Sequence, residues 1–152
     1  MNADSFKIQH ELSMTDSLVQ LSFHIQAILG RAGADHDLSV IQIRLLGILR
    51  DREPSMQQLA HYLSLDKSSI TGLIDRAERR GLVERTPSPT DRRGFQVKVT
   101  PAGRELTLVV SKEIEAQIHA LTEAISEPER AQFVALTAKL LGITTNTSKG
   151  GV

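Results

Sequence analysis

The sequence contains no cysteine and no tryptophan, and only 3% of its 152 residues are aromatic. The lack of cysteine excludes disulfide bonds, thiolate metal sites and a cysteine-based redox switch. Because aromatic side chains are so few, the core must consist of leucine, isoleucine, valine and alanine. No apolar run approaches the ~18 residues of a membrane span, and the N-terminal residues lack a basic-then-apolar signal pattern. We therefore expect a cytoplasmic protein without membrane contact.

The formal net charge is also zero, with 18 basic and 18 acidic residues, but the charges are unevenly distributed. Residues 66–104 contain nine basic and five acidic side chains, an excess of +4, which leaves an excess of −4 over the rest of the chain. A concentration of positive charge in one segment is typical of a nucleic-acid-binding surface. The alternative is an ordinary mixed surface, so the excess has weight only together with the motif below.

The basic segment begins with a predicted helix over residues 67–80. Asp66 can cap its N-terminus, and Gly81 ends it, because glycine adopts the left-handed conformation after a last turn without steric cost. Apolar side chains at helical spacing form one face of this helix. They are Ile70, Leu73, Ile74 and Ala77.

Two short strands are predicted after this helix, at residues 82–86 and 95–99, and the second alternates apolar and polar side chains. Residues 87–94 between them contain two prolines and a glycine and form a loop, with Arg92 and Arg93 near its tip. Helix, strand, basic loop and strand are the elements of a winged helix. The alternative is a plain helix and hairpin with solvated charges.

Two capping boxes precede the basic segment. Ser39 with Gln42 starts a helix that ends near residue 50, and Ser55 with Gln58 starts a shorter one. The shorter helix is joined to the helix at 67–80 by the three-residue turn 64–66. These two helices are therefore predicted to form a helix-turn-helix.

Longer helices flank this module, at residues 15–32, from 100 to about 124, and from 126 to 142. Their apolar positions exceed what one small module can bury, so we expect a two-fold dimer; the alternative is a monomer in which they pack on their own module. The predicted interface residues are Leu18, Leu21, Val109, Ile114, Ile118 and Leu121.

The predicted fold class is mostly α-helical with a small β-hairpin: a winged helix-turn-helix flanked by long dimerisation helices. Residues 1–36 would form an N-terminal arm and dimerisation helix, and residues 37–100 the DNA-binding lobe. Residues 101–143 would supply the C-terminal dimerisation helices, and residues 144–152 a disordered tail. All belong to one compact domain.

The polar side of the helix at 67–80 carries the candidate DNA contacts. A helix of this width fits the major groove, serine and threonine can meet base edges or phosphates, and arginine can pair with guanine or phosphate. The alternative is that these side chains merely face solvent. The candidates are Lys67, Ser68, Ser69, Thr71 and Arg76, together with Arg92 and Arg93 of the loop.

Three stretches resemble the MarR (multiple antibiotic resistance regulator) family of bacterial transcription regulators. GLVERTPSPTDRRGFQVKVTPAG is similar to the family's wing, LAHYLSLDKSSITGLIDRAERRG to its helix-turn-helix, and LSVIQIRLLGIL to its second helix. The resemblance covers residues 15–142. One departure is Ala77, which stands where the family usually has a larger apolar residue.

This resemblance implies a homodimer that binds a pseudo-palindromic operator and usually represses it. It also implies a small phenolic or aromatic-acid effector bound where the dimerisation helices meet the DNA-binding lobe, and Phe23, Ile43 and Leu46 are the candidate lining residues. The absence of cysteine excludes the peroxide-sensing branch. His10, His24, His36, His61 and His119 show no clustered spacing, so no metal site is expected.

The resemblance also assigns roles within the wing. The D-x-R spacing places Arg93 at the minor groove and gives Arg92 a phosphate contact. Asp91 lies two residues before Arg93, so its carboxylate can orient the Arg93 guanidinium. A narrow minor groove has enhanced negative potential, which attracts such an arginine.

Two other classes of function are weighed against DNA binding. The sequence has no G-x-S-x-G elbow, H-E-x-x-H motif or P-loop, so we expect neither an enzyme nor a cofactor. A winged helix can also serve as a protein-interaction module without specific DNA binding. Arg92 and Arg93 disfavour that alternative, because they sit where a groove-entering loop needs them.

Overall fold

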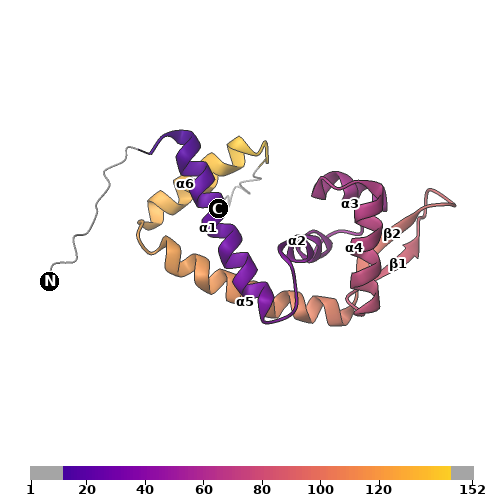
Figure 1. The fold of residues 1–152 in the computed structure, drawn as a ribbon. Helices are drawn as coiled ribbons and strands as arrows, with labels where there is room; N and C mark the ends of the chain where they lie inside the picture. The colour runs from indigo at the N-terminus through magenta and orange to yellow at the C-terminus, as the bar shows by residue number, and fades with distance from the viewer. Residues whose placement is uncertain (1–11, 145–152) are drawn as a thin grey trace, which may run out of the picture. The chain divides into compact units, whose positions relative to one another are not determined.

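The structure, a computed structural model, describes residues 12–144 (Figure 1). It confirms a mostly helical fold with one small β-hairpin. The predicted arm at residues 1–12 and tail at 144–152 lie outside the described residues, except for residues 12 and 144. The elements in chain order are α1 (Met14–Ala34), α2 (Val40–Leu49), α3 (Met56–Leu63), α4 (Lys67–Arg79), β1 (Val83–Pro87), β2 (Phe95–Val99), α5 (Pro101–Thr122) and α6 (Glu127–Leu140).

The chain falls into two compact units that meet within α5, between Ile114 and Glu115. The first unit holds the elements from α1 to the hairpin and the start of α5, and the second holds the rest of α5 and α6. The predicted boundaries at 36/37 and 100/101 separate functional parts instead, and these boundaries remain a prediction. No helix in the described range 12–144 is long and apolar enough to cross a membrane.

The predicted helix starts are confirmed by their hydrogen bonds. The hydroxyl groups of Ser39 and Ser55 each accept the backbone N–H of the residue three positions later. That residue is a glutamine, and its side-chain oxygen accepts the backbone N–H of the serine. Ser126 and Glu129 form a third such box. Local spacing alone specifies these starts, because both partners of each pair lie within one turn.

Four helix ends share one left-handed geometry. The residue after the end has positive φ, and the next N–H donates to the carbonyl five residues back, as in a Schellman motif. The left-handed residues are Asp37 (φ 53°), Ser64 (φ 53°), Gly81 (φ 70°) and Gly142 (φ 65°). The closing bonds are Leu38 to Gly33, Leu65 to Ala60, Leu82 to Ala77 and Ile143 to Ala138, at 2.9 to 3.0 Å. The predicted stop at Gly81 is thus confirmed.

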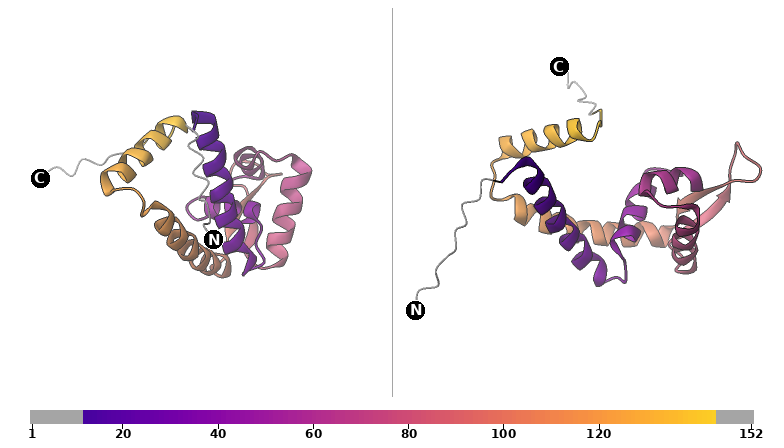
Figure 2. Two further views of the ribbon diagram at one scale, coloured as in Figure 1. Left: turned by 60° about the vertical axis from the view of Figure 1, so that its left-hand side comes forward. Right: turned by 45° about the horizontal axis from the view of Figure 1, so that its top comes forward.

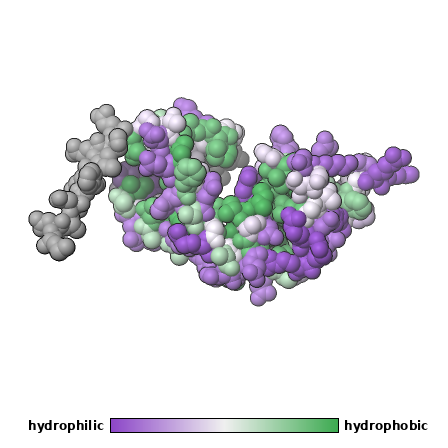
Figure 3. All heavy atoms as spheres, viewed as in Figure 1, coloured by the Kyte–Doolittle hydropathy of each residue, from purple (hydrophilic) through white to green (hydrophobic). Residues whose placement is uncertain are grey.

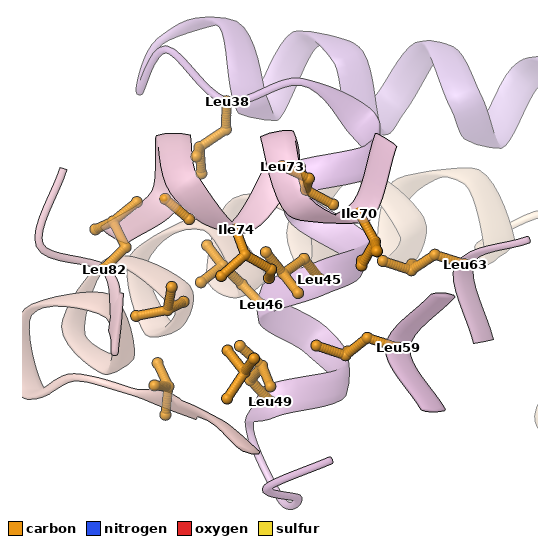
Figure 4. Close-up of a cluster of buried hydrophobic side chains, with 14 of the residues drawn as sticks. Leu38, Leu45, Leu46, Leu49, Leu59, Leu63, Ile70, Leu73, Ile74 and Leu82 are labelled. Carbon is orange, nitrogen blue, oxygen red and sulfur yellow. The ribbon is translucent and has the colours of Figure 1, made fainter. Parts of the chain in front are cut away.

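The core of the first unit lies where α2, α3 and α4 converge (Figure 4). Their apolar side chains point toward one another, and the predicted apolar face of α4 is buried along its whole length. Each such side chain contributes about 1.5–3 kcal/mol on burial, whereas a 13-residue helix alone is marginal in water. The most completely buried include Leu45, Leu59, Ile74 and Val97.

The hairpin is anchored to this core on one side and to the chain before α3 on the other. Val83 pairs with Val99 in the antiparallel register, and both are buried. The N–H of Val97 donates to the carbonyl of Pro54 at 2.9 Å, and Ser55 forms a bridge with Gln96. The strands are therefore fixed against the helix-turn-helix, while their connecting loop extends beyond α4 (Figure 2).

The segment Thr100-Pro101-Ala102-Gly103 joins the hairpin to α5 by a close backbone approach. The Thr100 hydroxyl accepts the Gly103 N–H at 3.0 Å and donates to the Gly81 carbonyl, while the Thr100 N–H donates to Leu82. A Cβ at Gly103 would overlap the Leu82 carbonyl. Gly103 has a helical backbone that any residue could adopt, so glycine is required here only because there is no space for a Cβ.

We predict that Gly103→Ala lowers the free energy of unfolding by about 1–3 kcal/mol, because the added methyl forces α5 away from the Leu82 carbonyl. Gly47→Ala in α2 is the control. It has no atom within 4 Å of its new Cβ and should stabilise by up to about 1 kcal/mol through helix propensity. Urea unfolding of both variants measures the difference. Equal stabilities would contradict the packing described for Gly103.

Candidate nucleic-acid interface

Helix α4 is the second helix of the helix-turn-helix, and we refer to it as the recognition helix. Its predicted contact side chains are all exposed, opposite the buried apolar face. Figure 3 shows hydrophilic residues gathered over α4 and the hairpin. The exposed candidates are Lys67, Ser68, Ser69, Thr71 and Arg76.

Two of the hydroxyl groups on this face are already engaged within the helix. The Ser69 N–H donates to Asp66 Oδ1 at 2.7 Å, and the Ser69 backbone and hydroxyl hold the pKa of the Asp66 carboxyl below its usual value. Thr71 Oγ1 donates to the Lys67 carbonyl at 2.8 Å. Thr71 therefore offers a base edge its oxygen lone pairs and its methyl group rather than a free donor.

The loop between β1 and β2 is ordered by its own hydrogen bonds. The Ser88 hydroxyl accepts the N–H groups of Thr90 and Asp91, and the Ser88 N–H donates to the Gly94 carbonyl. Asp91 Oδ1 accepts the backbone N–H of Arg93 at 3.0 Å. The expectation that this carboxylate holds the Arg93 guanidinium is thus corrected: the bond that forms fixes the backbone instead. Such Asx turns are what an aspartate two residues upstream favours.

All four candidate cations lack a partner within the described part of the chain. Lys67 stands at the first turn of α4, Arg76 lies on its exposed face, and Arg92 and Arg93 lie in the loop; all four are exposed. Within residues 12–144, none of these side chains makes a hydrogen bond or ion pair. Their charges therefore remain available to an external anion such as a phosphate.

A further basic residue, Arg85 of β1, has a different role that spacing alone does not reveal. Its guanidinium contacts Asp75 Oδ1 at 2.5 Å and Glu78 Oε1 at 3.2 Å, and its N–H donates to Glu78 Oε2 at 3.2 Å. Only 20% of the Arg85 side chain is exposed. This ion-pair group joins the wing to the recognition helix and removes one charge from the basic surface. The only sequence signal is an acidic pair three residues apart on α4.

A hollow of about 670 Å³ lies between α3, the start of α4 and the hairpin. Its apolar part includes Met56, Ile70 and Phe95, and Lys67 and Asp91 also line it. Its size is within the usual range of small-molecule sites, about 300–1,000 Å³. The recognition helix and the wing thus flank a concave surface.

The three predicted effector-pocket residues are not brought together. Ile43 and Leu46 line a small cavity of about 70 Å³ with Thr107 and Val110 of α5. Phe23 does not line this cavity, and 66% of it is exposed on α1. A volume of this size is below that of ordinary ligand pockets, so one protomer as described holds no ready site there.

The predicted interface positions leave apolar surface exposed among residues 12–144, although Ile114 packs against the core on one side. Leu18 is 48% exposed and Val109 is 43% exposed, whereas the other four are half-buried. Each unit exposes further large apolar side chains. These include Met14, Val19 and Leu108 in the first unit, and Phe133, Val134, Leu136, Leu140 and Leu141 in the second.

The histidines are dispersed, as the sequence indicates. His36 pairs with Glu113 at 3.1 Å, and His119 lies 3.7 Å from Glu123. Among the described residues, no group of three or more acidic, cysteine or histidine side chains could hold a metal ion. His10 falls outside that range.

A helix-turn-helix followed directly by a hairpin with a basic loop defines a winged helix-turn-helix protein. A profile of the MarR family matches residues 36–94, which run from the turn before α2 to the end of the wing loop and stop short of β2. Over this segment the chain is similar to the MarR family.

Individual relatives agree with this assignment. The chain is 37% identical over 81 residues to the HTH-type transcriptional repressor NicR of Pseudomonas putida, covering 53% of this chain and 51% of NicR. It is 28% identical over 129 residues to the HTH-type transcriptional regulator PecS of Dickeya dadantii, covering 82% of this chain and 77% of PecS. The crystal structure of apo MarR from E. coli superposes with a TM-score of 0.74 at 25% identity, covering 87% of this chain and 99% of the MarR chain. The chain spans about half the length of the first curated relatives it matches.

Proposed function

We propose that this chain is a sequence-specific double-stranded DNA-binding transcriptional regulator that acts as a ligand-responsive repressor. One observation carries the proposal: the exposed polar face of α4 and the wing loop present four cations, unpaired within residues 12–144, beside a set of short polar side chains. Similarity to known regulators supports it, since NicR is described as a transcriptional repressor. Its place of action would be the cytoplasm, where the DNA of a bacterial cell lies.

In this proposal α4 enters the major groove and the wing loop reaches the adjacent minor groove. Ser69 and Thr71 would meet base edges, and Lys67 would meet a phosphate near the N-terminus of the helix. Arg93 would enter the minor groove and Arg92 would contact the backbone. Asp91 would hold the loop backbone and make no contact with DNA.

The proposed assembly is a homodimer on a pseudo-palindromic operator. Two-fold symmetry presents the same recognition helix twice, and half-sites one helical turn apart require a separation of about 34 Å. The unpartnered apolar side chains of α1, α5 and α6 supply a surface for that contact. The protein would carry out no reaction, because regulation requires only binding.

A small phenolic or aromatic acid is proposed as the effector. It can relieve repression only if it binds the free protein and the DNA-bound protein with different affinity. The cavity beside Ile43 and Leu46 would have to enlarge, or be completed by a second protomer, to admit such a molecule.

Selection of bound sequences from a random DNA library tests the proposal directly. We expect the parent protein to enrich a motif with two inverted half-sites. Ser69→Ala and Thr71→Ala should change the enriched bases more than the overall affinity, because they remove contacts to base edges rather than charges. Failure of the parent to enrich any motif would favour a protein-interaction module instead.

Arg93→Ala should weaken operator binding by about 1–3 kcal/mol and reduce the salt slope by about one unit. The physical reason is the loss of one cation from the minor groove. Folding should be almost unchanged, because the Arg93 side chain is exposed and unpaired within residues 12–144. Binding isotherms at several salt concentrations and a melting curve measure both effects.

Arg52→Ala between α2 and α3 is the matched control for this variant, since it removes one exposed cation that the proposal places neither on DNA nor in the dimer contact. It should leave operator affinity and the salt slope unchanged. An Arg93→Ala protein that melts early but binds the operator like the parent would assign Arg93 a structural role only.

The assembly has its own test. Sedimentation at micromolar concentration should give the mass of a dimer, and Leu18→Glu combined with Val109→Glu should shift it toward a monomer, because charges would then face the contact. Operator affinity should fall with the dimer fraction. A stable monomer of the parent with undiminished operator binding would exclude the dimeric mode.

A further inference from the structure

The last residue of the recognition helix region, Arg80, connects α4 to a distant part of the chain. Its guanidinium donates from Nη1 to the carbonyl of Asp37 at 2.7 Å and from Nη2 to the carbonyl of His36 at 3.0 Å. These carbonyls belong to the turn between α1 and α2, more than forty residues earlier. A guanidinium presents its donors in a fixed planar fork, so two such bonds define an orientation as well as a distance.

The turn that Arg80 contacts is itself held rigidly. Asp37 occupies the left-handed conformation that closes α1, and the N–H of Leu38 returns to Gly33 at 2.9 Å. Leu38 is buried in the core beside α4, as Figure 4 shows. The carbonyls at this turn therefore have little freedom to follow Arg80 if α4 moves.

The same turn is connected to α5. His36 Nε2 lies 3.1 Å from Glu113 Oε1, and only 23% of the His36 side chain is exposed. Arg80, the turn and Glu113 thus form a continuous polar connection from the end of α4 to α1 and to the first part of α5, all within the first compact unit.

We propose that Arg80 is a positioning residue that fixes the recognition helix relative to α1 and the first part of α5. The inference rests on the proposed function, in which those helices contribute to the dimer contact and α4 reads the operator. Arg80 then sets the separation of the two recognition helices without touching DNA. Its neighbour Arg79 does not share this role, because its Nε donates to the Asp75 carbonyl, and that bond stays within α4.

The first test needs no DNA and uses the absence of native cysteine. Spin labels are attached at His24→Cys on α1 and Ser68→Cys on α4, both exposed positions, in protein diluted with unlabelled chains so that each pair reports one protomer. The distance distribution should be narrow in the parent and clearly broader in Arg80→Met. Arg79→Met should match the parent, and Arg80→Lys should be intermediate, because lysine keeps the charge but lacks the planar fork.

The second test measures binding to operators whose half-site spacing is changed by one base pair in either direction. Arg80→Met should lose about tenfold at the optimal spacing, the size of one charge-assisted hydrogen bond, yet lose little more at the altered spacings. Binding to an isolated half-site and the salt slope should stay as in the parent. Arg79→Met should retain the sharp spacing optimum.

Each result decides one point. An unchanged label distribution in a folded Arg80→Met protein overturns the positioning role. A reduced salt slope with an unchanged spacing profile overturns it too and makes Arg80 a phosphate contact. If the parent ignores spacing, the proposed dimeric binding fails, while the label distributions still decide whether Arg80 holds the helix.

Discussion

Burial of one face of α4 is the constraint on which the rest of the module depends. Ile70, Leu73 and Ile74 pack against α2 and α3, and this packing fixes which side chains of the helix face outward. A 13-residue helix would be marginal alone, so its polar face is presented in a defined direction only while the opposite face is buried. The wing depends on the same core through Val83, Val97 and Val99.

The parts of this fold that local sequence specifies could be predicted, and the parts that depend on distant partners could not. Capping at Ser39, Ser55 and Asp66 involves residues three apart, so the spacing alone predicts each helix start. The fork from Arg80 to the α1–α2 turn crosses more than forty residues and has no periodic signal. The exposed Phe23 shows the same limit, because apolar spacing indicates a buried face without identifying what covers it.

Within the interface, arginines that look alike in the sequence have different physical roles. Arg85 is neutralised by Asp75 and Glu78 and joins the wing to α4, whereas Arg92 and Arg93 in the loop have no ion-pair partner in the part of the chain that the structure describes. Counting basic residues therefore overstates the charge that the module presents to DNA. Asp91 likewise differs from what its spacing suggests. It contacts Arg93 two residues on, but its carboxylate accepts the backbone N–H of Arg93 rather than binding the guanidinium.

The bond from the Val97 N–H to the Pro54 carbonyl has a consequence for local unfolding. Because this amide is buried under the connection that leads into α3, it can exchange with solvent only when the strand separates from that connection. Opening of the base of the wing therefore requires β2 to leave the chain before α3. The tip is held by bonds of Ser88 and Asp91 within the loop, so it can open while the base stays in place.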